Sequence, residues 1–343
     1  MSDILLRELS NADIDWMVNN GERQSLPAKT DLILPNQVLE KLYLVLEGQL
    51  SMSTPCRGRE FAWLSRGDLF GAGWLFDIEP VSIIFAKTEA VVLAIPKARL
   101  LEKLKTDVSF AVHFYRSIAL IMSERIRAEF ESTESRAELL RYESGEMVKE
   151  ALVVFGELHD SDIDWMMSAG HIESVAAEKV LLNMGRPVDA LYTVLDGQLA
   201  IATTSQPYDP FSGCSHTLEL QRQAFTPIAY ISKGSLPGII SFLDFKPLPV
   251  RIHAIRESKV LSIPRTKVII KLQEDLGFAA RFYRVIATQT ANLLNSVTAT
   301  ECKSSADSNE PMLEGELNME QLQRASQGGQ KFDWMIKQLR VEV

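Results

Sequence analysis

The sequence predicts two tandem copies of one mainly β domain with flanking helices (α+β), each copy a β-roll of the jelly-roll type. The first observation is a repeat. Residues 13–50 recur as residues 162–199 without insertion or loss, opening with Asp-Ile-Asp-Trp-Met and closing with Leu-x-Gly-Gln-Leu in both copies. The second is that residues 93–116 recur as residues 261–284, beginning with Leu-x-Ile-Pro and ending with Phe-Tyr-Arg. A period of this length is that of a whole domain rather than of a solenoid unit.

Composition and charge narrow the class of protein. The chain has 343 residues, 46% of them hydrophobic, which is enough for two domains with ordinary cores. Its net charge of −9 argues against a nucleic-acid partner, which would require a basic surface to neutralise phosphates. The three cysteines form no metal or redox pattern and fit a reducing compartment. We find no signal-peptide pattern and no spanning segment, and therefore expect a cytoplasmic protein that does not insert into membranes.

The first copy is predicted to contain helices, short strands and closing helices, in that order. Residues 5–20 are expected to form short helices, with Asn11 as an N-cap. Short apolar runs bounded by Pro, Asn and Gly indicate antiparallel strands at residues 31–34, 42–46, 60–64, 82–87 and 91–95, with a Gly-rich turn at 67–73. Pro96 begins a helix to Lys105, and Asp107 caps a closing helix to Arg127 that has an apolar stripe.

The second copy repeats this plan with one insertion. The offset between the copies grows from 149 residues at Leu199 to 167 residues at Gly234, so about 18 residues are added, which we interpret as a longer surface hairpin. Its closing helix is predicted from Asp275 to Val297. The chain is therefore divided into a first domain (1–130), a helical linker (131–158), a second domain (159–300) and a flexible acidic and polar tail (301–343) with a short terminal helix.

Two features of this plan concern assembly. The closing helices carry apolar stripes that would fit each other, which predicts an intrachain pseudo-dimer; the alternatives are a homo-oligomer, or stripes that pack only on their own β-rolls. In the tail, Asp333-Trp334-Met335 echoes the Asp-Trp-Met of both copies. This segment is either the remnant of a third copy's opening helix, a helix that docks on one of the domains, or a coincidence.

Each half presents an opening helix, a β-roll with Leu-Tyr-x-Val-Leu-x-Gly, a Gly-Asp/Ser-x-x-Gly turn, a final Leu-x-Ile-Pro strand and a long closing helix. This series resembles the cyclic nucleotide-binding domain family, the effector-domain fold of the catabolite activator protein, over residues 9–127 and 159–294. The resemblance implies a regulatory protein. A DNA-binding module is not expected, because the residues after Thr300 are polar, acidic and too few for a winged helix.

In that family the ligand lies in a phosphate-binding cassette, Gly-Glu followed by Arg-Ser/Thr-Ala-x-Val-x-Ala. The cyclic phosphate meets N–H groups at the start of a short helix, the Arg donates to the phosphate, and the Glu accepts from the ribose hydroxyl. At the corresponding positions of the first copy the chain has Gly71, Ala72 in place of Glu, Pro80 in place of Arg, and Ser82 in place of Ala.

The second cassette has Gly238, but Ile239 in place of Glu and Leu248 in place of Arg. Both cassettes therefore lack both polar anchors, and each such hydrogen bond to a charged group contributes about 1.5–3 kcal/mol. Arg251 is a candidate cation that a shifted loop would bring to a phosphate. The candidate ligand-binding residues are Gly71, Ala72, Ser82, Gly238, Ile239 and Arg251.

The sequence leaves two functions open. The first is a regulatory scaffold whose degenerate domains bind another protein, without a cofactor. The alternative is a sensor of cyclic AMP, cyclic GMP or another small anion, with the second domain as the better site because Asp77 and Glu79 in the first would repel an anion. An enzyme is not expected, since the chain shows no nucleophile–base set, no paired catalytic carboxylates and no metal-ligand spacing, and so no catalytic or metal residues are assigned.

Overall fold

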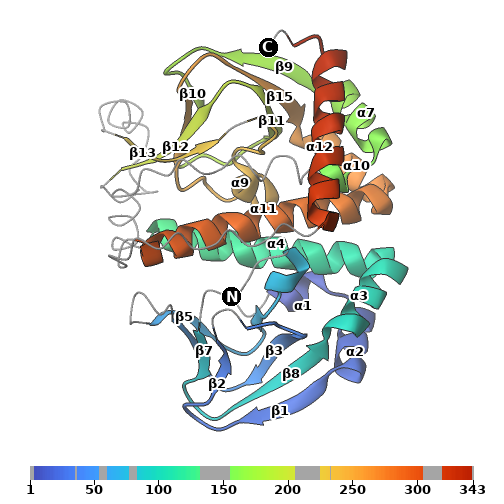
Figure 1. Cartoon of the computed structure of the whole chain (residues 1–343), viewed down its shortest axis with the longest axis vertical. Coiled ribbons are helices and arrows are strands. Elements are labelled where there is room, and N and C mark those ends of the chain that lie inside the picture. The colour runs from blue at the N-terminus through green and yellow to red at the C-terminus, as the bar shows by residue number, and fades with distance from the viewer. Residues whose placement is uncertain are drawn as a thin grey trace. The chain divides into compact units, whose positions relative to one another are not determined.

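The computed structural model describes most of the chain (Figure 1), namely residues 4–34, 37–53, 60–76, 83–131, 155–204, 225–231, 233–303 and 319–341. Contacts divide the chain into two compact units. Unit 1 contains Met1–Glu124 and Thr290–Met312, and unit 2 contains Arg125–Gln289 and Leu313–Val343. Each unit contains one β-roll with flanking helices, which confirms the predicted fold class. Most of the predicted linker and the predicted long hairpin fall outside the described residues.

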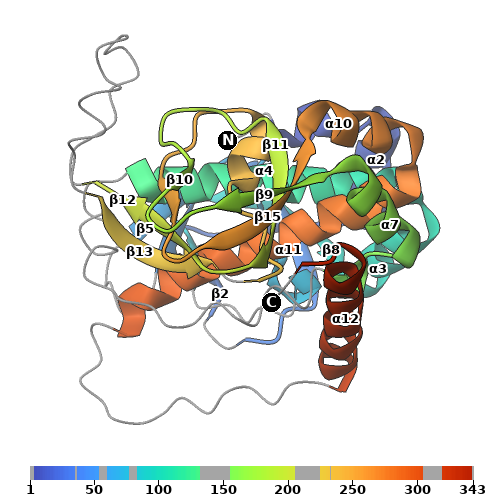
Figure 2. The same cartoon turned by 90° about the horizontal axis from the view of Figure 1, so that it is seen from above.

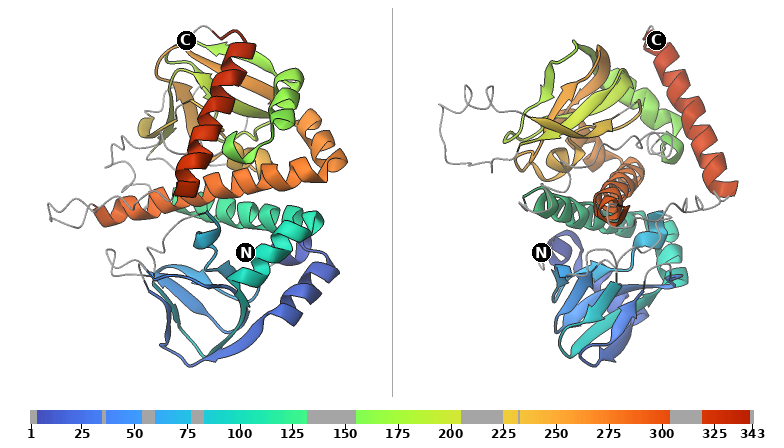
Figure 3. Two further views of the ribbon diagram at one scale, coloured as in Figure 1. Left: turned by 45° about the vertical axis from the view of Figure 1, so that its right-hand side comes forward. Right: turned by 60° about the vertical axis from the view of Figure 1, so that its left-hand side comes forward.

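The β-roll of unit 1 consists of two antiparallel four-stranded sheets, with strand orders β1-β8-β3-β6 and β2-β7-β4-β5 (blue strands in Figure 3). The strands are β1 (Glu22–Leu26), β2 (Asp31–Ile33), β3 (Lys41–Glu47), β4 (Leu50–Ser53), β5 (Glu60–Leu64), β6 (Leu69–Phe70), β7 (Ile83–Ala86) and β8 (Ala90–Pro96). Side chains from both sheets meet in one apolar core. Its buried members are Leu26, Ile33, Leu39, Val45, Leu50, Leu64, Phe70, Ile84, Ala86, Ala90 and Val92.

Helices precede and follow the strands of unit 1 in the sequence, and one short 3-10 helix lies between β6 and β7. They are α1 (Ile4–Glu8), α2 (Asn11–Asn20), the short 3-10 helix η1 (Gly73–Phe76), α3 (Lys97–Thr106) and α4 (Val108–Glu131). The N-cap of α2 is Ser10, not the predicted Asn11. The Ser10 hydroxyl accepts from the N–H of Asp13, and the Asp13 carboxylate accepts from the N–H of Ser10. This reciprocal pair satisfies two N–H groups that a helix start otherwise leaves free.

Unit 2 is built on the same plan, with a three-stranded sheet, β11-β15-β9, and a four-stranded sheet, β10-β14-β12-β13. Its strands are β9 (His171–Val175), β10 (Val180–Leu182), β11 (Ala190–Asp196), β12 (Leu199–Thr203), β13 (Thr226–Ile231), β14 (Arg251–Ala254) and β15 (Ser258–Pro264). Its helices are α7 (Asp160–Ala169), α9 (Ile239–Asp244), α10 (Arg265–Glu274), the part of α11 (Leu276–Lys303) before Thr290, and α12 (Met319–Gln338). Figures 1 and 2 both show α12 beside α7, on which it packs.

Four strands of each roll have the same burial pattern in both copies. The sequence of exposed and buried positions is the same in β1 and β9, in β2 and β10, in β7 and β14, and in β8 and β15. Tyr43 pairs with Ala94 and Tyr192 pairs with Ser262, which are the same positions of the repeat. Because a one-residue slip would move every side chain to the opposite face, this agreement confirms the repeat in detail.

Among the described helices, none has the length and apolar character needed to cross a membrane.

Candidate functional site

The second cassette starts at a turn that requires glycine. Gly238 has φ +76°, and a Cβ at this position would lie 2.5 Å from the Leu182 side chain. Its carbonyl oxygen accepts from the N–H groups of Ser241 and Phe242, at 3.1 and 3.0 Å, which starts α9. The backbone frame of a cassette, a left-handed glycine followed by a short helix, is therefore present in unit 2.

The two anchor positions of this cassette hold buried apolar side chains. Ile239, the first residue of α9, is 7% exposed, and Leu248, in the loop after α9, is 2% exposed. The backbone of Leu248 is held on both sides, since its N–H donates to Arg186 (2.9 Å) and its carbonyl accepts from Gly185 (2.8 Å). The sequence placed these two side chains in one cassette, and in the structure both are apolar and buried, so neither offers a charged or polar group to a ligand.

Ser241 uses its hydroxyl group to hold the loop that follows α9. The hydroxyl accepts from the N–H of Val188 at 3.2 Å and donates to the carbonyl oxygen of Lys246. Ser241 is fully buried, as is Val188 at 2% exposed. A buried hydroxyl with two partners of this kind fixes one conformation of the cassette, because leaving either partner unpaired would be costly.

A buried ion pair anchors the C-terminal end of α9. Arg127, near the end of α4 and within unit 2, donates from Nε and Nη2 to the two carboxylate oxygens of Asp244, at 3.0 and 2.8 Å. The side chains of Arg127 and Asp244 are 9% and 6% exposed. Arg127 also donates to the carbonyl oxygens of Lys246 and Pro247. The guanidinium fork thus binds a carboxylate with two parallel hydrogen bonds and places a cation beside the last turn of a helix, both favourable arrangements.

Sequence reasoning missed this ion pair. Arg127 was predicted only as the end of a closing helix, and Asp244 was not considered. The available signal was weak, since a lone Arg at the end of an amphipathic helix and a lone Asp in a short helix are common surface residues. What distinguishes them is burial, which depends on chain segments 117 residues apart.

Arg251 lies on the outer face of β14. Ile252 and Ala254 are buried in the roll, and Ile252 pairs with Ile201, whereas Arg251 and His253 alternate with them and are partly exposed. The Arg251 guanidinium lies 3.6 Å from the centre of the Phe225 ring. Burial lowers the pKa of Arg251 below its usual value. Burial also lowers the pKa of His253, helped by the positive charge of Arg251 and opposed by Glu178.

The first cassette keeps its glycine, but aromatic and apolar groups fill its surroundings. Gly71 has φ +79°, and a Cβ there would lie 3.1 Å from the Tyr43 ring. The Tyr43 ring stacks on Phe70 with a centroid distance of 5.1 Å. Ala72 is 5% exposed, and the Trp74 side chain packs against the core of the roll. Ser82 and Pro80 fall outside the described residues.

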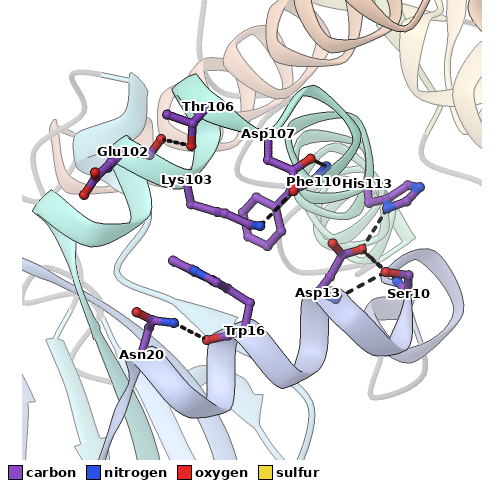
Figure 4. A network of polar contacts seen from close by, with 10 residues as sticks. All are labelled: Ser10, Asp13, Trp16, Asn20, Glu102, Lys103, Thr106, Asp107, Phe110 and His113. Atoms are coloured by element: carbon purple, nitrogen blue, oxygen red, sulfur yellow. Dashed lines mark hydrogen bonds and ion pairs between the residues drawn. The ribbon is translucent and has the colours of Figure 1, made fainter.

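A polar network holds the opening helix of unit 1 against its closing helix (Figure 4). The Asp13 carboxylate lies 2.8 Å from His113 Nδ1 and accepts from the Ser10 hydroxyl at 2.7 Å. Burial alone would raise the pKa of Asp13, but the hydrogen bonds from Ser10 and His113 lower it below its usual value. Nearby, the Trp16 ring meets Phe110 edge-on, at a centroid distance of 5.2 Å.

Unit 2 repeats this network with two exchanges, of which the first is His159 at the N-cap position of Ser10. Arg281 stands at the position of His113, and its Nε and Nη2 donate to the two oxygens of Asp162, at 2.7 and 2.8 Å. Trp165 meets Phe278 edge-on, again at 5.2 Å. Through these contacts each tryptophan anchors the opening helix of its unit on the closing helix. The described residues contain no group of three or more side chains that could hold a metal ion.

Comparisons with known proteins place the first roll in a family. Residues 23–107 match the family model described as "Cyclic nucleotide-binding domain". No curated protein matches the chain. Solved structures similar to it include the regulatory domain of Toxoplasma gondii PKA with cAMP, which is 16% identical with a TM-score of 0.29, and the match covers 80% of this chain and 89% of that chain. Thermus thermophilus catabolite activator protein is 19% identical with a TM-score of 0.34, and the match covers 50% of this chain and 75% of that chain.

A third similar structure is the regulatory subunit of a cAMP-independent protein kinase A from Trypanosoma cruzi bound to guanosine. It is 12% identical with a TM-score of 0.29, and the match covers 88% of this chain and 86% of that chain. Similarities this distant do not indicate which ligand this chain binds. The assignment of the fold therefore rests on the family match and on the sheet topology described above.

Proposed function

We propose, on the premise that residues 23–107 form a cyclic nucleotide-binding domain, that this chain is a non-enzymatic regulatory protein that binds another protein and has lost tight cyclic-nucleotide binding. The observation that carries the proposal is Leu248, which is 2% exposed at the position where the family has its phosphate-binding Arg. A phosphate that enters an apolar roll loses its hydration, and this loss must be offset by donors. A leucine side chain supplies none.

The other features of the cassettes support the same function. Ile239 at the ribose-binding position is 7% exposed and has no acceptor. Arg251 lies on the outer face of β14, stacked on Phe225, rather than on the inner face with Ile252. In unit 1, Ala72 occupies the position of the Glu, and Trp74 packs against the core next to it. Each of these side chains favours a roll that is filled by the protein itself.

The second candidate function is a sensor of a cyclic nucleotide or another small anion, acting through unit 2. The observation that favours it is the retained backbone frame, with Gly238 in the left-handed region and α9 following directly. N–H groups at the start of such a helix attract an anion through hydrogen bonds and a dipole effect of about 0.3–1 kcal/mol. Without the Arg and the Glu, we expect this frame to give only weak binding.

Calorimetric titration of the full chain with cyclic AMP and cyclic GMP tests the proposal. We expect no saturable heat at physiological nucleotide concentrations. Inorganic phosphate, titrated in parallel, shows whether the frame of α9 retains a weak anion site. A dissociation constant of about 1 μM or tighter for either nucleotide, equivalent to about −8 kcal/mol, would return the protein to the class of cyclic-nucleotide sensors.

A further inference from the structure

The C-terminal helix α12 covers one face of unit 2. The Phe332 ring packs on Phe155 at a centroid distance of 5.0 Å, and α12 packs on α7 near the C-terminal end of α12 (Figure 2). Met335 and Ile336, three and four residues further on, are 0% and 8% exposed. On the same helix, Lys331 Nζ donates to the carbonyl oxygen of Leu158 at 2.6 Å. α12 is therefore an amphipathic helix with an aromatic anchor, two aliphatic side chains and one lysine on its contact face.

The same face exists in unit 1, because the repeat places it there. The positions 149 residues before Phe155 and Ile163 are Leu6 and Ile14. Phe155 and Ile163 are both fully buried, whereas Leu6 is 66% exposed and Ile14 is partly exposed. Val18, four residues after Ile14, is 47% exposed. Ile14 and Val18 lie on one side of α2, since residues four apart in a helix are neighbours.

These exposed fractions show that, among the described residues, the face of unit 1 lacks a covering helix. An exposed leucine by itself needs no explanation, but here the second copy of the domain shows that Phe332 of α12 packs on Phe155, the equivalent of Leu6. In the described part of unit 1, no helix covers Leu6, which is 66% exposed, as α12 covers Phe155, and Val18, beside Ile14 on α2, is 47% exposed. We name Leu6, Ile14 and Val18 the α1–α2 face.

We propose that the α1–α2 face is the docking site for an amphipathic helix of another protein, with the chemistry of α12: one aromatic side chain, aliphatic side chains three and four residues later, and a lysine just before the aromatic. This inference rests on the proposed protein-binding function and identifies the surface that would bind the partner. It does not depend on whether the cassettes bind a ligand. The lysine requirement follows from the backbone, because Leu9 stands at the repeat position of Leu158 and offers the same carbonyl oxygen.

One difference between the faces indicates how a partner helix would differ from α12. Lys331 also lies 3.7 Å from the Asp160 carboxylate, and the repeat position in unit 1 holds Asn11. Arg7, whose side chain is 65% exposed, stands beside Leu6 where unit 2 has Gly156. At Asn11 and Arg7 the α1–α2 face is thus less acidic than its counterpart, and the exposed guanidinium of Arg7 lies 3.0 Å from Glu8. A partner helix with an acidic residue near Arg7, in addition to the lysine, would complement this charge.

A peptide with the sequence of residues 319–343 serves as the probe. Labelled with a fluorophore, it is titrated with the full chain, in which α12 already covers unit 2, and binding is followed by anisotropy. We expect saturable binding at one site. Leu6→Lys combined with Val18→Lys should weaken it at least about tenfold, because apolar anchors at the centre of a contact dominate its affinity. Val38→Lys, at a valine of unit 1 that is 79% exposed, is the matched control and should leave binding unchanged.

A second measurement locates the peptide without any variant of the protein. A photo-crosslinking group at the position of Phe332 in the peptide should attach to residues 4–20. Attachment to residues 155–169 would mean that the peptide only exchanges with α12 on unit 2, and would overturn the proposal. So would the absence of saturable binding, or unchanged binding to the Leu6→Lys, Val18→Lys variant with an intact circular dichroism spectrum.

Two further outcomes separate this inference from related ideas. Self-association of the full chain that the same two substitutions abolish would assign the face to a second copy, which contradicts a foreign partner. Cyclic AMP is titrated into the same samples. Tight nucleotide binding would contradict the proposed function, while the peptide result would still decide whether the α1–α2 face binds a helix.

Discussion

Arg127 and Asp244 are 117 residues apart in the sequence, yet the guanidinium of Arg127 donates to both carboxylate oxygens of Asp244 in the interior of unit 2. Neither side chain is more than 9% exposed. A pair of charges at this depth is not necessarily a net source of stability, because both ions have lost their hydration. Replacing only one of the two residues, however, leaves the charge of the other buried and unpaired.

Asp244→Ala is therefore expected to destabilise unit 2 by about 3–5 kcal/mol, the usual effect of breaking a buried ion pair from one side. Arg127→Met combined with Asp244→Leu, which removes both charges and keeps much of the volume, should cost much less. Hydrogen exchange of the strands of unit 2 measures both effects. As a control, Lys41→Ala breaks the exposed pair with Glu22 and should change stability by about 0–1 kcal/mol. A similar loss of stability in the single and the double variant would contradict this account.

Restoring the missing anchors should restore nucleotide binding. Ile239→Glu with Leu248→Arg supplies a ribose acceptor and a phosphate donor on the existing frame of Gly238 and α9. Two charge-assisted contacts of about 1.5–3 kcal/mol each correspond to an affinity gain of about two to four decades, measured by calorimetry with cyclic AMP. Leu248→Met, which keeps the apolar character, should give no gain. If the double variant folds and still shows no binding, groups other than these two are missing.

His253 should make unit 2 less stable in acid. Burial and Arg251 hold the pKa of His253 below its usual value of about 6.5, so the folded protein binds this proton at lower pH than the unfolded chain does. As pH falls below about 6.5, the unfolded state binds more protons and stability decreases until the folded-state pKa is reached. His253→Phe, which copies Phe85 at the same position of the first repeat, should flatten this decrease. Equal slopes of melting temperature against pH in both proteins would show that other groups cause the decrease.

The docking of α12 should depend on one of two nearby aromatic residues. Phe332 is 6% exposed and packs on Phe155, so Phe332→Ala is expected to cost the local structure about 3–5 kcal/mol and to release α12. Trp334, two residues away, is 38% exposed, and Trp334→Ala is the matched control with a small effect. Hydrogen exchange of residues 319–341 distinguishes the two variants. Equal loss of protection in both would mean that helix propensity, rather than the Phe332 contact, holds α12.

The fold could be predicted from the sequence because each copy of the repeat tests the interpretation of the other. Two copies with the same turn glycines and the same strand patterns can only fold alike, and Tyr43 and Tyr192 indeed have equivalent register. The cap of α2 was assigned one residue too late, since Ser10 and Asn11 are both good caps and only the side-chain geometry of Asp13 decides between them. The domain boundaries and the pseudo-dimer of closing helices remain predictions.

The candidate site was less predictable. The family pattern located Ile239, directly after Gly238, and Leu248, six residues before Ala254, but it did not show that Arg251 lies on the outer face of its strand. Trp74 and the pair of Arg127 and Asp244 were not identified, because their roles depend on burial by distant segments. The docking of α12 was one of three interpretations of Asp333-Trp334-Met335, and the contact that holds it is made by Phe332, next to the echoed motif.

The position of Arg127 also has a consequence for how the protein is made. A fragment that began at residue 159, where the second copy starts in the sequence, would contain Asp244 without its cation, so the smallest independent form of unit 2 must begin before Arg127. During synthesis, Arg127 leaves the ribosome 117 residues before its partner. At about 5–20 residues per second this interval lasts about 6–23 seconds, during which Arg127 has no Asp244 carboxylate to bind.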